Sequence, residues 1–264
     1  CPNASNYSRK VIDELTEYLK QYFGAKGLAW MKCIEGKLDG GISKFFPESV
    51  QAEIMTDLAI ENNSILFMVG DTANTVFSSL GVLRLELAKR ENLIDTTAWA
   101  PLWVIDFPLV EWNAEQQRWD ALHHPFTSPN LDDLDKLDSD PGNVRSLGYD
   151  VVMNGYELGG GSIRIHDKDL QAKIFTLLGI SDDDAQEKFG FLMDAFRYGA
   201  PPHGGMAFGF DRIIMLLAGS NQIRDVIAFP KTTSALSLMD NSPSLVTEEQ
   251  LDELHLSVIQ DSEE

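Results

Sequence analysis

Apolar positions in the first part of the chain follow patterns typical of helices and strands in turn. From residue 5 to residue 22 they recur with a period near 3.6, which predicts an amphipathic helix, and Gly24 is a stop signal for it. By the same reasoning the region holds strands over 27–34 and 64–70 and helices over 47–62 and 72–91. The residues of the last helix expected to face inward are Leu80, Leu83, Leu87 and Ala88. These elements predict a small α+β unit.

After the break at Trp99-Ala100-Pro101 the patterns change. Ser181 followed by a run of aspartates has the form of an N-cap with an acidic first turn, which predicts a helix that runs to Tyr198. The other predicted elements are strands over 102–110 and 206–210 and helices over 169–178 and 211–217. An aspartate-rich run over 132–140 ends in Pro-Gly, and we interpret it as a solvated loop.

The strongest local signal is Asn154-Gly155, which lies between two apolar runs and predicts a tight hairpin turn. With these two residues in the turn, Val152 pairs with Glu157. Glu157 then shares a face of the sheet with Asp150, because side chains alternate along a strand. Such diagonal positions lie about 7–8 Å apart at Cα. The two carboxylates can therefore converge on one metal ion or on a cation bound to a polyphosphate.

Three glycines, 159–161, follow directly inside the predicted return strand. Glycines at such places usually mark a bulge or a close approach of backbone or ligand, and a plain flexible bend is the alternative. Arg164 lies seven residues after Glu157, an odd spacing that puts the two on opposite faces of an unbroken strand. A site that contains both therefore requires a bulge at the glycines.

Arg212 falls in the first turn of the predicted helix over 211–217, directly after a strand. Positive charge is unfavourable at a helix N-terminus, so the arginine needs another reason to be there. An anionic ligand supplies one, because backbone N–H groups, the helix dipole and the guanidinium would together hold a phosphate. A structural ion-pair network around Asp211 is the alternative.

Composition excludes several classes of protein. Apolar residues make up 44% and charged residues 23% of the 264 residues, which excludes collagen-like, low-complexity and wholly disordered chains. No apolar run approaches the roughly 20 residues of a membrane span, and we expect no membrane or secretion signal. Two cysteines, Cys1 and Cys33, cannot build a disulfide framework, so we expect a reducing, cytoplasmic location. Because the chain begins at Cys1 rather than Met, we expect a fragment or a processed product.

The charge of the chain is strongly negative and unevenly distributed. A formal net charge of −20 disfavours a broad nucleic-acid-binding surface. Residues 1–98 carry 10 basic and 13 acidic side chains, whereas residues 99–264 carry 11 and 28. This change in composition predicts a domain boundary near residue 98.

Several motifs, taken together and in order, resemble the bacterial-type aspartyl-tRNA synthetases, a family of class II aminoacyl-tRNA synthetases. They are Glu157-Leu158-Gly159-Gly160-Gly161-Ser162-Ile163-Arg164, the segments 203–212 and 223–231, and His123-His124-Pro125-Phe126-Thr127. The resemblance covers essentially the whole chain. Residues 1–98 resemble the insertion (GAD-like) domain of that family, truncated at its start, and residues 99–264 the C-terminal half of its catalytic domain. The implied fold is α+β, with an antiparallel sheet flanked by helices and a small α+β insertion domain.

The resemblance also implies a reaction and its participants. The family activates L-aspartate with ATP and Mg²⁺ to aspartyl-adenylate and transfers it to tRNA(Asp), and its full-length members are expected to be homodimers. Most contacts with tRNA would belong to regions that precede this chain, so we expect the chain by itself to be inactive.

Site residues carry over by position. Arg164 is similar to the arginine that pairs with the side-chain carboxylate of aspartate, and His123 to a histidine beside it, with His124 an equal alternative. Arg212 and Glu157 are implied as catalytic, and Asp150 and Glu157 as metal ligands. The residues implied at ATP are Glu157, Gly209, Phe210, Asp211 and Arg212.

Two other classes of protein fit part of the sequence. A stand-alone amino-acid ligase on the same fold would keep the residues for ATP but is not expected to carry residues 1–98. A non-catalytic interaction module derived from a synthetase would keep the core and need not bind ATP. Binding of ATP, measured by calorimetry, distinguishes this module from an enzyme.

Overall fold

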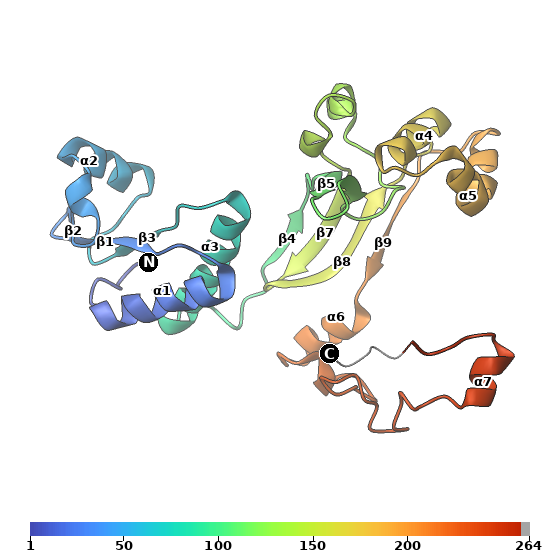
Figure 1. Cartoon of the computed structure of the whole chain (residues 1–264). Helices are drawn as coiled ribbons and strands as arrows, with labels where there is room; N and C mark the ends of the chain where they lie inside the picture. Colours follow the sequence, from blue (N-terminus) through green and yellow to red (C-terminus); the bar gives the residue numbers. More distant parts are fainter. Residues whose placement is uncertain (260–264) are drawn as a thin grey trace. The chain divides into compact units, whose positions relative to one another are not determined.

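The computed structural model describes residues 1–259, and the chain forms two compact units, 1–98 and 99–264 (Figure 1). The division falls where the charge balance of the sequence changes. Both units combine helices with antiparallel strands, so the predicted α+β class is confirmed. Within residues 1–259, no helix has the length and apolar character needed to cross a membrane.

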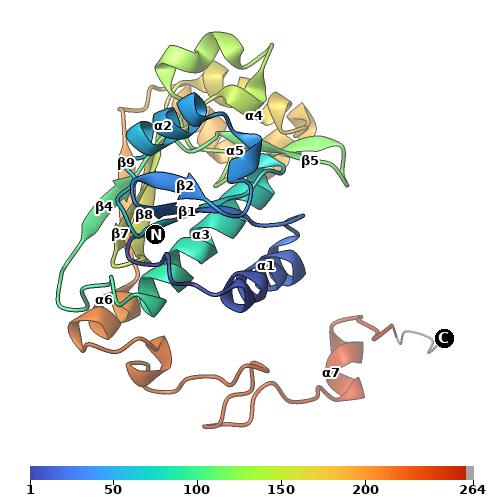
Figure 2. The same cartoon turned by 90° about the vertical axis from the view of Figure 1, so that its left-hand side faces the viewer.

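The first unit contains a three-stranded antiparallel sheet in the order β2-β1-β3. Helices α1 and α3 pack against each other next to it (Figure 2). In chain order the elements are α1 (Arg9–Phe23), β1 (Ala29–Ile34), β2 (Lys37–Asp39), α2 (Glu48–Asp57), β3 (Ile65–Met68) and α3 (Ala73–Arg90).

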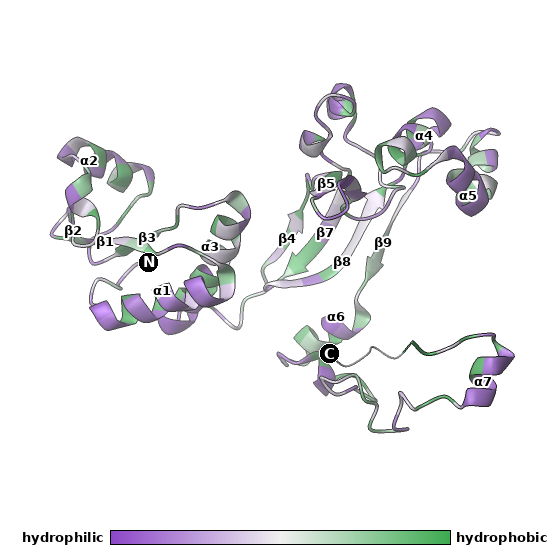
Figure 3. Ribbon diagram, viewed as in Figure 1, coloured by the Kyte–Doolittle hydropathy of each residue, from purple (hydrophilic) through white to green (hydrophobic). Residues whose placement is uncertain are grey.

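Local capping sets the ends of α1. The Oγ of Ser8 accepts a hydrogen bond from the N–H of Val11, so the helix begins at Arg9, later than the sequence pattern predicted. Gly24 ends it as expected, with a φ of 69° that favours glycine. Hydrophobic and hydrophilic residues share the surface of this helix (Figure 3), and its buried stripe of Ile12, Leu15 and Leu19 enters the core.

One of the residues predicted to face inward from α3 does not. Leu83 and Leu87 are buried as expected, but the position one turn before them is Ser79, and Leu80 is 37% exposed. The reason is geometric, because the buried residues follow a strict spacing of four and Leu80 lies about 100° round the helix from that line.

The second unit is built on a four-stranded antiparallel sheet in the order β4-β7-β8-β9, with a two-stranded β5-β6 sheet as a separate element. Its strands are β4 (Pro101–Val104), β5 (Val110–Asn113), β6 (Arg118–Ala121), β7 (Gly148–Met153), β8 (Tyr156–Ile163) and β9 (Gly204–Phe208). Its α-helices are α4 (Lys168–Leu177), α5 (Asp182–Phe196), α6 (Phe210–Leu217) and α7 (Glu248–Glu253). Ser181 caps α5 by accepting from the N–H of Asp184, as predicted.

The strand predicted over 102–110 is wrong as a single element. It ends at Val104, and Val110 begins the separate strand β5. Between them Asp106 has a φ of 59°, a left-handed conformation that is incompatible with a continuous strand. The apolar run is therefore divided between two sheets.

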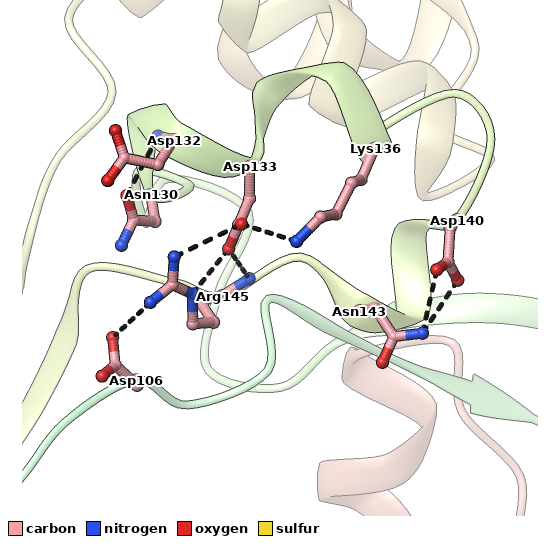
Figure 4. A network of polar contacts seen from close by, with 8 residues as sticks. All are labelled: Asp106, Asn130, Asp132, Asp133, Lys136, Asp140, Asn143 and Arg145. Carbon is pink, nitrogen blue, oxygen red and sulfur yellow. Dashed lines mark hydrogen bonds and ion pairs between the residues drawn. The ribbon is translucent and has the colours of Figure 1, made fainter.

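The aspartate-rich run over 132–140 is not a solvated loop throughout. Asp133 is 2% exposed and lies in a short 3-10 helix, Leu131–Lys136. Its carboxylate accepts hydrogen bonds from Nε of Arg145 at 2.7 Å, from the backbone N–H of Arg145 at 3.1 Å and from Nζ of Lys136 at 2.7 Å (Figure 4). The local pattern gave no sign of this network because Arg145 is twelve residues away.

Candidate functional site

The hairpin formed by β7 and β8 turns at Asn154 and Gly155, as predicted. Their φ angles are 52° and 85°, and two consecutive positive values are the signature of the type I′ turn, which suits hairpins. Val152 faces Glu157 across the strand pair. Glu157 and Asp150 therefore share a face, as the register argument required.

A bulge interrupts β8 just after Glu157. Val152 opposes Glu157 but Val151 opposes Gly159, so Leu158 is the extra residue. The bulge thus exists, one residue before the glycines at which the sequence argument had placed it. Beyond it the alternation of side chains carries Gly160, Ser162 and then Arg164 to the same face as Glu157.

All three glycines allow close approaches that a larger residue would prevent, and a Cβ at Gly159 would collide with the carbonyl oxygen of Ala207. A Cβ at Gly160 would collide with Oδ1 of Asp150, so the aspartate side chain lies directly over the glycine. A Cβ at Gly161 would collide with the carbonyl oxygen of Gly205 on β9. The glycines therefore let the Asp150 carboxylate and strand β9 come close to β8, and the flexible-bend alternative does not describe them.

The predicted site residues meet in one open cavity of about 460 Å³ in the second unit. Those that line it are His123, Asp150, Glu157, Arg164, Gly209 and Arg212. Phe210 and Asp211, expected beside the nucleotide, do not line it. His124 and Ser162 do, and Ser162 was not singled out from the sequence although it stands two residues before Arg164 on the same face. The spacing of two residues between Ser162 and Arg164 is the sequence signal that could have identified Ser162.

Arg164 is held by a histidine. Its Nη1 lies 3.1 Å from Nδ1 of His124, and because a guanidinium can only donate, the imidazole nitrogen is the acceptor. Burial of the imidazole, and after it the charge of Arg164, lower the pKa of His124. A neutral His124 therefore orients the guanidinium, while His123 lines the cavity beside it and meets the ring of Phe107 edge-on.

Arg212 is joined to the bulge from the other side. Its Nη1 donates to the carbonyl oxygen of Glu157 at 2.8 Å, and the N–H of Gly209 donates to the carbonyl oxygen of Leu158 at 2.7 Å. These bonds fix the start of α6 against β8. Within residues 1–259 none of Arg164, Asp211 and Arg212 forms an ion pair, so the structure does not support the alternative of an ion-pair network around Asp211.

The carboxylates of Asp150 and Glu157 are the only acidic groups among the cavity-lining residues. The described part of the chain contains no cluster of three or more potential metal ligands. Two carboxylates in one cavity nevertheless fit Mg²⁺, which keeps several waters and usually takes one or two protein carboxylates together with substrate phosphates.

The second unit thus combines an antiparallel sheet, an arginine where strand β9 leads into helix α6, and a pair of carboxylates. The chain belongs to the family of class II tRNA synthetases (D, K and N), whose model matches residues 9–233. The class II antiparallel fold and the aspartyl-tRNA synthetase resemblance inferred from the sequence are thereby supported.

Particular relatives are aspartate-tRNA ligases. The chain is 54% identical over 256 residues to the aspartate-tRNA ligase of Halalkalibacterium halodurans, covering 97% of this chain and 43% of the relative. It is 51% identical over 255 residues to the aspartate-tRNA(Asp/Asn) ligase of Caldanaerobacter subterraneus subsp. tengcongensis, with the same coverage of 97% and 43%. The chain thus spans less than half the length of these relatives.

Among solved structures, the chain resembles the aspartyl tRNA synthetase of Entamoeba histolytica. The sequence identity is 25% and the TM-score 0.42, over 70% of this chain and 30% of that one.

Proposed function

We propose that the whole protein is an aspartate-tRNA ligase that activates L-aspartate with ATP and transfers it to tRNA(Asp). The observation that supports this most is a single cavity lined by two arginines, Arg164 and Arg212, and by two carboxylates, Asp150 and Glu157. Within residues 1–259 neither arginine forms an ion pair. Such a cavity suits one carboxylate substrate and one polyphosphate. The names of the relatives agree with it.

The first step is an in-line attack by an α-carboxylate oxygen of aspartate on the α-phosphorus of ATP. The new P–O bond gives aspartyl-adenylate, and the bond to the β-phosphate breaks to release pyrophosphate. A hydroxyl of the terminal ribose of tRNA then attacks the activated carbonyl, and AMP leaves. The first step needs no covalent enzyme nucleophile, so its barrier falls mainly through positioning and neutralisation of charge.

Arg164 would recognise the side-chain carboxylate of aspartate. A guanidinium can donate to both carboxylate oxygens, and the contact with His124 fixes the plane of this fork. Asparagine would offer an amide instead and leave the half-buried charge of Arg164 unpaired, which provides selectivity. His123, which lines the same cavity, would contact the bound aspartate.

Arg212 would bind the phosphates of ATP at the start of α6, where backbone N–H groups also point. Gly209 allows the nucleotide to approach, and Phe210 and Asp211 would contact it from outside the lining of the cavity. Glu157 would contact the nucleotide and, together with Asp150, would bind a magnesium ion. Bound there, magnesium would supply positive charge to the phosphates and the leaving pyrophosphate.

The two units take different parts in this proposal. Residues 99–264 would be the C-terminal half of the catalytic domain, and residues 1–98 most of the insertion domain of the bacterial-type enzymes. The remaining half of the catalytic domain and most of the tRNA contacts would be supplied by sequence that the relatives possess outside the matched 43%. The full-length form would be a homodimer.

Aminoacylation by the full gene product tests this function. Incubated with ATP, Mg²⁺ and bacterial tRNA, the protein is expected to attach labelled aspartate to tRNA. Calorimetry with ATP distinguishes this function from the alternative of a non-catalytic interaction module, which need not bind ATP. Absence of both aspartyl-tRNA formation and ATP binding would favour that module and contradict the proposal.

A further inference from the structure

A buried glutamine outside the lining of the cavity holds the segment that carries both histidines. Gln171 on α4 is 0% exposed, and its Nε2 donates to the carbonyl oxygen of Pro125 at 2.9 Å. Pro125 directly follows His123 and His124. The amide of Gln171 thus fixes the backbone one residue beyond the histidine that contacts Arg164.

The same segment is anchored at its far end by the sheet and by aromatic packing. Thr127 forms a bridge with Arg164, and the N–H of Ile165 donates to the carbonyl oxygen of Phe126. The ring of Phe126 meets Phe175 of α4 and Phe189 of α5 edge-on. These contacts fix residues 126 and 127, so the bond from Gln171 is the contact that acts on Pro125 itself.

Packing alone does not explain a glutamine at this position. Within residues 1–259 its Oε1 is buried and has no hydrogen-bond partner. A buried acceptor without a partner is unfavourable, so the amide carries a cost that a methionine of similar length would avoid. The bond from Nε2 to Pro125 is the one polar interaction that the side chain gains in return.

We infer that Gln171 is a positioning residue for aspartate recognition, acting through Pro125 and His124 on the guanidinium of Arg164. This role rests on the proposed function, because Arg164 must bind the side-chain carboxylate for the position of His124 to matter. Loss of the Gln171 bond lets the histidine segment move and turns the fork of Arg164 away from its working plane. Binding of aspartate weakens, whereas binding of ATP at Arg212 does not.

The test compares Gln171→Met with Gln51→Met in the full gene product. Gln51 is a matched control, since its Nε2 also donates to backbone carbonyls, those of Ser43 and Phe46, but it lies in the first unit. In ATP–pyrophosphate exchange, Gln171→Met is expected to raise the KM for aspartate about tenfold and to change the KM for ATP less than twofold. Gln51→Met is expected to change neither.

A second variant, Gln171→Glu, separates the hydrogen bond from packing. Its side chain has the same shape, but only the protonated carboxyl can donate to Pro125. The ratio of its KM for aspartate to that of the wild type should therefore fall towards one as the pH is lowered. Taking the ratio removes the pH dependence that the substrate and the groups shared by both proteins contribute.

The outcomes are distinct. A wild-type protein that exchanges with aspartate, together with an aspartate-specific and pH-dependent effect at Gln171, supports the role. Equal losses for aspartate and ATP in Gln171→Met, or a ratio for Gln171→Glu that does not vary with pH, would overturn it while leaving the proposed function intact. A wild-type protein without aspartate-dependent exchange would overturn both.

Discussion

At the scale of single residues, the two arginines of the cavity differ in what holds them. Arg164 donates to the imidazole of His124, whereas Arg212 donates to the backbone carbonyl of Glu157. The guanidinium of Arg164 is therefore oriented by a side chain and that of Arg212 is tied to the bulge. Under the proposed function, Arg164 would face the substrate carboxylate and Arg212 the phosphates. The two arginines should therefore respond differently to replacement by lysine, which keeps the positive charge.

We predict that Arg164→Lys lowers the kcat/KM for aspartate by about 10²-fold, because lysine keeps the charge but loses the planar fork. Arg212→Lys should raise the KM for ATP more than the KM for aspartate. ATP–pyrophosphate exchange with each substrate varied measures both. Near wild-type efficiency of Arg164→Lys with aspartate would show that the arginine acts only as a general positive charge.

Gly160 provides a second prediction at this scale. Gly160→Ala places a methyl group where Oδ1 of Asp150 now lies, so the carboxylate must move and the magnesium-dependent exchange rate should fall by about 10²-fold. Gly205→Ala is the matched control in the same sheet, since a Cβ there meets nothing within 4 Å. An unchanged exchange rate in Gly160→Ala would mean that magnesium-dependent exchange does not depend on the position of the Asp150 carboxylate.

At the scale of elements, the hairpin and its surroundings show what a sequence can specify. The turn and the pairing of Val152 with Glu157 follow from Asn154-Gly155 and alternation, and both are present. The bulge was inferred only because Arg164 needed it, and its place at Leu158 depends on the pairing of β8 with β7, which no local pattern contains. Strand order and the burial of Asp133 likewise depend on partners distant in the sequence.

The buried Asp133 network predicts a pH-dependent stability. Hydrogen bonds from Arg145, and then from Lys136, hold the pKa of Asp133 well below its ordinary value. A carboxyl with a lowered folded-state pKa stabilises the fold above its unfolded pKa of about 3.9, and that contribution is lost as the pH falls below this value. Asp133→Asn should therefore lower the melting temperature at pH 7 and lower it less as the pH approaches the acid range.

Asp138→Asn is the control for this measurement. Asp138 pairs with Lys173 at 2.7 Å, but its side chain is 77% exposed, and solvent screens such pairs. Thermal unfolding followed by circular dichroism should show a clear loss for Asp133→Asn and almost none for Asp138→Asn. Equal effects of the two substitutions would mean that the Asp133 network contributes no more than a surface ion pair.

At the scale of the whole molecule, the charge pattern agrees with the proposed division of labour. Residues 99–264 hold 11 basic and 28 acidic side chains, yet two of the basic residues, Arg164 and Arg212, line the cavity and form no ion pair with any residue that the structure describes. Two of the eleven basic side chains of this unit thus lie where, under the proposed function, an amino-acid carboxylate and a polyphosphate would bind. A broad nucleic-acid surface would need sequence from the remaining length that the relatives possess.

The central claim is that this cavity activates aspartate with ATP. The most direct measurement is ATP–pyrophosphate exchange by the full gene product, with each of the standard amino acids supplied in turn. The account predicts magnesium-dependent exchange with aspartate and none above background with asparagine or glutamate. Exchange that prefers another amino acid, or no exchange with aspartate in an otherwise folded protein that binds ATP, would contradict it.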